Sequence, residues 1–302
     1  MILGRSFGTQ TTKPRFFPAI NRRAEFRGKI AKTRFERDCL NEYAEVFKTV
    51  SVDAAYYVFP KKENLQRLAG QTPDDFKFGF KVTDAITVKR FPNLPRFAAR
   101  AGQLNSDFLN ADLFAAAFLA PCEAIRSKVG VVMFEFSRFW PSDYEHGRDF
   151  IADLDAFFGK LPKGWPYAVE TRNQKWLHQE YFSCLARHGV AHVFNSWQAM
   201  PSVKEQMAMP DSRTSPELLA ARFLLAPGRK YNEAVEAFQP YERTHEINEE
   251  ARRAAADLII EGLHLLYEPR TKTYIYINNR LEGNALLTLQ AILAVVGTGL
   301  GR

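Results

Sequence analysis

The sequence lacks several features that would place it in a familiar class of proteins. No apolar run reaches the length of a membrane span, because the longest candidate, Ala285 to Val296, contains Thr288 and Gln290. The first residues do not follow the pattern of a secretory signal peptide. Neither a Gly-x-Gly-x-x-Gly sequence nor a P-loop is present, and no serine lies in the context of a nucleophile elbow. We therefore expect no membrane partner, and no motif points to a nucleotide site or a serine hydrolase.

Cysteine is scarce. The three cysteines, Cys39, Cys122 and Cys184, are far apart in the sequence and odd in number. This pattern is typical of reduced thiols in the cytoplasm and not of a disulfide framework or a zinc knuckle. His188 and His192 are four residues apart, but Gly189 separates a predicted helix from a predicted strand between them. They therefore lack the spacing of a zinc pair on one helix, and we expect both to be structural.

Excess positive charge is absent from most of the chain. Residues 1–38 contain ten basic and three acidic residues, which accounts for the whole net charge of +7. The remaining residues contain 31 basic and 31 acidic side chains. This neutral body makes nucleic acid an unexpected partner for residues 39–302. We interpret residues 1–38 as a solvated edge, with a poorly ordered arm or a weak polyanion contact as alternatives.

The 302 residues are 46% hydrophobic and alternate between strand-like and helix-like segments without a break in composition. This alternation predicts one α/β domain with a parallel sheet. Clear strands are expected near residues 50, 78, 132, 168, 192, 222 and 275. Helices are expected between them, with Pro121 splitting the one over Ala111 to Ser127 and a loop over Met200 to Pro216. Both a barrel and a doubly wound sheet fit this order.

Polar residues recur at the ends of the predicted strands. The apolar run Tyr167 to Val169, for example, leads directly into Glu170-Thr171-Arg172. Charges at the carboxyl ends of parallel strands face a crevice, and in a barrel they converge on one mouth. Taken singly, each has a structural interpretation, such as an ion pair between Glu170 and Arg172 or turn-forming asparagines. The full set is Asp53, Lys81, Glu135, Glu170 with Arg172, Asn195, Arg222, and Asn278 with Asn279.

Several segments also form a pattern together. They are Glu170-Thr171-Arg172 followed by Trp176, Lys81 followed by Ile86-Thr87, Tyr56-Tyr57 followed by Pro60, Arg222, and the closing Asn278 to Ala285. In this pattern the chain resembles the YecE-like family, domain of unknown function 72, from about residue 25 to 296. The resemblance implies a TIM-type (β/α)8 barrel in the bacterial cytoplasm. It implies no activity, because the function of the family is unassigned.

The chain departs from the family pattern in ways that indicate a divergent branch. Ser51 and Asp53 stand where the family has Glu and Asn, and Glu135-Phe136-Ser137 replaces Gln-Leu-Pro. The opening Gly-Thr-Ser-Gly-Trp strand of the family has no good counterpart before residue 34. We therefore expect a basic, poorly ordered segment over residues 1–24, and a barrel over residues 25–302 whose first strand is missing or irregular. A native start upstream of Met1 is a further expectation.

Two hypotheses about function follow. In the first, the mouth is the active site of an acid–base hydrolase, lyase or isomerase, with Glu170 and Glu135 as catalytic residues whose pKa values are pushed apart. In the second, the mouth binds a metabolite or a nucleic-acid end without turnover. An anionic or polyhydroxylated small molecule would contact Arg172, Lys81, Arg222, Asp53, Asn195, Trp176, Asn278 and Asn279. We expect no cofactor, with Mg²⁺ or Mn²⁺ on Asp53, Glu135 and Glu170 as an alternative.

Overall fold

Seven parallel strands form a nearly closed barrel. The computed structural model describes residues 25–26, 29–30, 32–263 and 271–299. The strands pair in chain order, each with the next, so that consecutive strands are neighbours around the barrel. All seven lie where the sequence predicts them. Their bounds are β3 (Thr49–Val52), β4 (Lys77–Lys81), β5 (Val129–Phe136), β6 (Tyr167–Thr171), β7 (Ala191–Ser196), β8 (Leu218–Phe223) and β9 (Lys272–Ile277).

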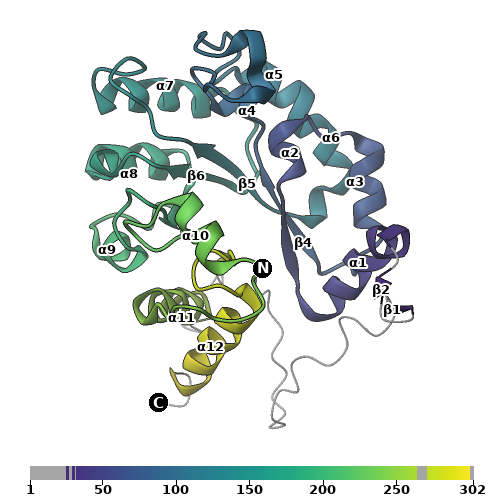
Figure 1. Ribbon diagram of the computed structural model, residues 1–302. Helices are drawn as coiled ribbons and strands as arrows, with labels where there is room; N and C mark the ends of the chain where they lie inside the picture. Colours follow the sequence, from purple (N-terminus) through teal and green to yellow (C-terminus); the bar gives the residue numbers. More distant parts are fainter. Residues whose placement is uncertain (1–24, 27–28, 31, 264–270, 300–302) are drawn as a thin grey trace.

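Helices follow the strands and cover the outside of the barrel (Figure 1). None of the helices in the described ranges is both long and apolar enough to cross a membrane. The longer ones are α1 (Lys32–Val46), α3 (Lys62–Ala69), α7 (Gly147–Lys160), α8 (Gln179–Arg187), α10 (Tyr231–Phe238), α11 (Glu249–Leu263) and α12 (Ala285–Gly299). The shorter ones are α2 (Ala54–Tyr57), α4 (Asp84–Thr87), α5 (Ala111–Leu113), α6 (Ala120–Cys122) and α9 (Val203–Ala208).

Alternation along the strands separates two packed layers. Every residue of β5 is buried, because one face of the strand lines the barrel and the other contacts helices. Val131 and Met133 belong to an apolar cluster inside the barrel. Phe134 and Phe136 point the other way and pack against aromatic side chains of the outer layer, including Phe150 of α7. A period of two therefore determines which side chains reach the barrel interior.

The barrel has an unsealed seam between β3 and β9, which do not pair with each other. In the described residues nearest the start, β1 (Glu25–Phe26) and β2 (Lys29–Ile30) pair only with each other, as a two-stranded antiparallel sheet. This agrees with the expectation that a regular first barrel strand is missing. The prediction of a poorly ordered segment over residues 1–24 concerns residues outside the described part of the chain.

Two helical regions test the finer predictions. The helix expected over Ala111 to Ser127 runs without a gap through α5, a π-helical turn (Phe114–Leu119), α6 and a 3₁₀ segment (Glu123–Lys128), and its backbone departs from helical geometry at Ile125 and not at Pro121. The prediction of a loop over residues 200–216 is wrong, because this segment contains α9. Ser202 caps that helix and Glu205 returns the contact, a capping box that the spacing Ser-x-x-Glu already encodes.

Candidate anion site at the barrel mouth

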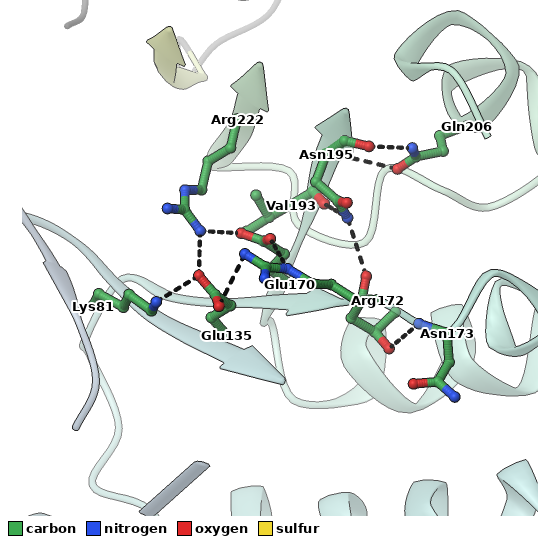
Figure 2. Close-up of polar contacts among 10 residues, drawn as sticks. Lys81, Glu135, Glu170, Arg172, Asn173, Val193, Asn195, Gln206 and Arg222 are labelled. Atoms are coloured by element: carbon green, nitrogen blue, oxygen red, sulfur yellow. Dashed lines mark hydrogen bonds and ion pairs between the residues drawn. The ribbon is translucent and has the colours of Figure 1, made fainter. Parts of the chain in front are cut away.

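Five charged side chains meet at the carboxyl end of the barrel, and we call them the mouth network (Figure 2). Glu135 Oε2 lies 2.7 Å from Lys81 Nζ and accepts a hydrogen bond of 2.6 Å from Arg222 Nη1. The other oxygen of Glu135, Oε1, lies 2.9 Å from Arg172 Nη2. Glu170 Oε1 accepts from Arg172 Nε at 3.2 Å, and Glu170 Oε2 accepts from Arg222 Nη1 at 2.5 Å.

The alternation of the strands explains why these residues converge. In β5, the inward positions are Val131, Met133 and then Glu135. In β8, they are Leu218, Ala220 and then Arg222. Apolar side chains thus fill the lower part of the barrel, and the next inward position is charged. Glu135 and Glu170 are direct register partners in β5 and β6, so the sheet itself brings the two carboxylates together.

Cations lie nearer to solvent than carboxylates in this network. The side chains of Lys81 and Arg172 are each 13% exposed and that of Arg222 is 10% exposed. Those of Glu135 and Glu170 are only 3% and 0% exposed. Three cations and two anions also leave one excess positive charge. Solvent therefore contacts the cations more than the carboxylates.

The pKa shifts follow from this mixture of burial and charge. Burial alone would raise the pKa of Glu135, but Arg172, Arg222 and Lys81 together hold it well below its usual range. Burial lowers the pKa of Lys81 and Glu135 raises it, while Arg222 and Arg172 add to the lowering, so the net shift is downward. Burial would also lower the pKa of Arg222, but Glu170 and Glu135 raise it. Glu135 is thus ionised at neutral pH, and not held protonated by the neighbouring carboxylate.

Two aromatic rings contact the cations, and neither is among the site residues predicted from the sequence. Arg172 Cζ lies 3.9 Å from the centre of the Trp197 ring, and Lys81 Nζ lies 3.6 Å from that of Tyr56. Contacts of this kind are attractive because the ring face carries partial negative charge. Two features of the sequence could have indicated these rings: Trp197 comes immediately after β7, and the Tyr56-Tyr57 pair follows β3.

Asn195 occupies the inward position at the end of β7, beside the network. Its Nδ2 donates to Thr171 O at 3.1 Å, while its backbone N donates to Gln206 Oε1 and its backbone O accepts from Gln206 Nε2. Gln206 belongs to α9, the helix that was predicted as a loop. The buried Oδ1 of Asn195 accepts no hydrogen bond from the described residues. This leaves an acceptor group close to the charged cluster.

The other four predicted site residues make no described contact with the mouth network. Asp53 is exposed at the start of α2, and its Oδ1 accepts from Ser51 Oγ at 3.4 Å. Asn278 Oδ1 accepts from the backbone of Arg280, and Asn279 Oδ1 accepts from that of Ala285. These asparagines hold the turn that leads into α12, which is the turn-forming interpretation of the pair.

Trp176 borders a cleft beside the network. The cleft has a volume of about 520 Å³, and its lining includes Trp176, Trp140 and Arg172. Trp176 stacks on Phe139 and Phe150 at centroid distances of 5.5 and 5.1 Å. Of the five residues of the mouth network, only Arg172 lines this cleft, so Trp176 is a wall of the cleft and not a member of the network.

A Mg²⁺ or Mn²⁺ site on Asp53, Glu135 and Glu170 does not form. Asp53 is exposed and the oxygens of both glutamates are engaged by cations. In the part of the chain that the structure describes, the one group of three residues that could hold a metal ion is Asp155, Cys184 and His188, outside the mouth. His188 and His192 do not face each other: His188 contacts Asp155, and His192 contacts Tyr181.

The fold and the charged mouth together define a (β/α) barrel protein with a candidate small-molecule site. The model of the family described as "Protein of unknown function DUF72" matches residues 27–300, and the chain belongs to this family. No curated protein matches the chain.

Solved structures of two members of the family resemble the chain. A DUF72 family protein from Enterococcus faecalis V583 shares 18% identity with a TM-score of 0.59, over 87% of this chain and 94% of its own. Another from Thermotoga maritima MSB8 shares 19% identity with a TM-score of 0.53, over 89% of each chain. At these identities the likeness shows the fold alone.

Proposed function

We propose that the mouth of the barrel binds a small anionic molecule through a phosphate or carboxylate group. The observation that carries this proposal is the order of charge in the mouth network, with three cations above two buried carboxylates. Guanidinium groups are well suited to such ligands because their donors match the geometry of two oxygens. The adjoining cleft would hold the rest of the molecule, with Trp176 and Trp140 as apolar walls.

The two glutamates give this site its rigidity. Arg222 Nη1 donates to both Glu135 and Glu170, and Arg172 also contacts both of them. Each guanidinium is therefore held from two directions, which fixes its orientation before a ligand arrives. The ionised state of Glu135 suits this positioning role, because a protonated carboxyl would lose most of its attraction for the cations.

An acid–base reaction on the bound anion is the second candidate function, and the environment of Lys81 favours it. Its pKa is lowered, its ammonium lies against the Tyr56 ring, and Glu135 is 2.7 Å away. An amine with a lowered pKa exchanges protons more readily near neutral pH. In this proposal Glu135 and Glu170 are the other candidates for a catalytic role, as the sequence indicates.

Anion binding can be tested by thermal shift with a panel of phosphorylated and carboxylated metabolites. A ligand at a hundred times its dissociation constant should stabilise the wild-type chain by about 2.7 kcal/mol. Arg172→Gln should weaken binding about tenfold or more, because a hydrogen bond to a charged group contributes roughly 1.5–3 kcal/mol. Arg126→Gln is the matched control, since Arg126 lines a separate cleft at the opposite end of the barrel.

Three results would count against the proposal. They are the absence of any shift across the panel, an equal shift in Arg172→Gln, and a shift lost only in Arg126→Gln. A steep salt dependence that disappears with residues 1–38 would point to a polyanion contact instead. For the second candidate function, the panel is also assayed for turnover, and equal rates in the wild type and Glu170→Gln would remove Glu170 from the mechanism.

A further inference from the structure

A second cluster of reactive side chains lies between two outer helices, α7 and α8. Asp155 projects from α7, Cys184 lies within α8, and His188 directly follows the last residue of α8 as its C-cap. Their candidate ligand atoms all lie within 4.8 Å of one another. Neither the charged mouth nor the function proposed for it uses any of these residues. We propose that the three residues form a binding site for a zinc ion.

The geometry is close to that of a bound ion. His188 Nε2 is 2.7 Å from Asp155 Oδ1, and Cys184 Sγ is 3.9 Å from the same oxygen. Metal–ligand bonds of about 2.0–2.3 Å separate the ligands of a tetrahedral zinc ion by roughly 3–4 Å. Of the three separations, one therefore lies just below this range and one within it, and the third, between Cys184 and His188, is at most 4.8 Å. The ion would take the place of the hydrogen now shared between His188 and Asp155, and the Cys184 thiol would release its proton to solvent as it becomes a thiolate ligand.

The chemistry of the donors favours zinc over hard cations. A thiolate, an imidazole and a carboxylate are the three ligand types that zinc uses, whereas Mg²⁺ and Ca²⁺ prefer oxygen alone. Cys184 and His188 are four residues apart, which places them on one face of α8. Asp155 can bind through Oδ1 alone, because Arg187 Nη1 lies 3.3 Å from the other oxygen and holds the carboxylate in position.

One ligand of the proposed site is buried in the protein, and another is in contact with solvent. Cys184 is fully buried, whereas the side chain of Asp155 is 37% exposed. His188 also lines the cleft of about 540 Å³ at the amino-terminal end of the barrel. An ion can therefore enter from solvent, and a water molecule can occupy the fourth coordination position. Three protein ligands with one open position form an arrangement that zinc adopts widely.

The test uses Co²⁺ as a spectroscopic probe of the full, tag-free chain. Wild-type protein should bind one equivalent and develop the near-ultraviolet charge-transfer band of a thiolate bound to cobalt, and Zn²⁺ should abolish that band by displacement. Cys184→Ser should remove the band. Asp155→Asn should keep a thiolate ligand but weaken the binding of both ions about tenfold or more. Circular dichroism of each variant shows whether the fold is retained.

Cys122→Ser is the matched control, since Cys122 is equally buried but lies in α6, outside the cluster. It should bind Co²⁺ with the wild-type band and affinity. The proposal is overturned if the wild-type chain shows no band with excess Co²⁺, or if folded Cys184→Ser keeps it. It is also overturned if folded Asp155→Asn binds as tightly as the wild type, which would reduce the cluster to a histidine–carboxylate pair beside a thiol.

Discussion

Replacing Glu135 with glutamine should lower the free energy of unfolding at pH 7 by about 3–5 kcal/mol, because it breaks a buried ion cluster. Glu135 contacts Lys81, Arg172 and Arg222, and its side chain is almost fully buried. In the variant, Glu170 would be the only carboxylate left in the network to balance the charge of three cations. Glutamine keeps the shape of the side chain but offers only one acceptor oxygen and no charge, so the loss is mainly electrostatic.

The same variant should change how stability depends on pH. The pKa of Glu135 in the folded chain lies below its ordinary value of 4.5. A carboxyl with a lowered folded pKa contributes stability that is fully present above the unfolded pKa and is lost as the pH falls through the folded value. Glutamine cannot titrate. The difference between wild type and Glu135→Gln should therefore be largest above pH 5 and should narrow as the pH is lowered to 3.

Urea denaturation at pH 7, 5 and 3 measures both effects. Glu261→Gln is the control, because Glu261 pairs with Arg213 through two hydrogen bonds but lies at the surface. Such a pair contributes about 0–1 kcal/mol. Equal losses at pH 7 in the two variants would show that the mouth network contributes no more than a surface ion pair. A gap that stays constant down to pH 3 would contradict the lowered pKa of Glu135.

The strands and all five residues of the mouth network can be predicted from the sequence, for a physical reason. A strand alternates between two faces, so Lys81, Glu135, Glu170 and Arg222 are placed by counting along short apolar runs. Parallel strands then bring their carboxyl ends to the same mouth, whatever the details of the helices. Convergence therefore needs only local pattern and topology, both of which can be read from one sequence.

Residues placed by turns and helices could not be predicted in the same way. β3 ends at Val52, so Asp53 lies in the turn before α2 and is exposed to solvent. Asn279 serves the start of α12. The contact of Arg172 with Trp197 joins segments whose spacing depends on how the loops fold over the mouth. Asp155 meets Cys184 and His188 only because α7 and α8 pack side by side, which no local pattern records.

Replacing Gly79 with alanine should lower the free energy of unfolding by about 3 kcal/mol, because the barrel interior has no room for the added methyl group. Gly79 lies in the middle of β4, a position where a parallel strand ordinarily has a bulky residue. A Cβ atom there would be only 1.8 Å from Tyr276 Oη and 2.8 Å from Tyr276 Cζ. Tyr276 is buried inside the barrel, so its ring cannot move away freely.

A double-mutant cycle with Tyr276→Phe tests this cause. Tyr276 Oη is buried and makes no hydrogen bond with the described residues, so removing the hydroxyl group alone should be nearly neutral or slightly stabilising. Tyr276→Phe removes Oη, the atom closest to the added methyl group, but keeps Cζ. The double variant Gly79→Ala/Tyr276→Phe should therefore lose less stability than the sum of the losses in the two single variants. Coupling of about 1 kcal/mol or more is expected for residues in such contact. Gly297→Ala, with no atom near its added carbon, is the control and should be neutral or slightly stabilising. Strictly additive losses would contradict this cause. They would mean that glycine is needed at position 79 for its backbone conformation and not for the space that the Tyr276 ring fills.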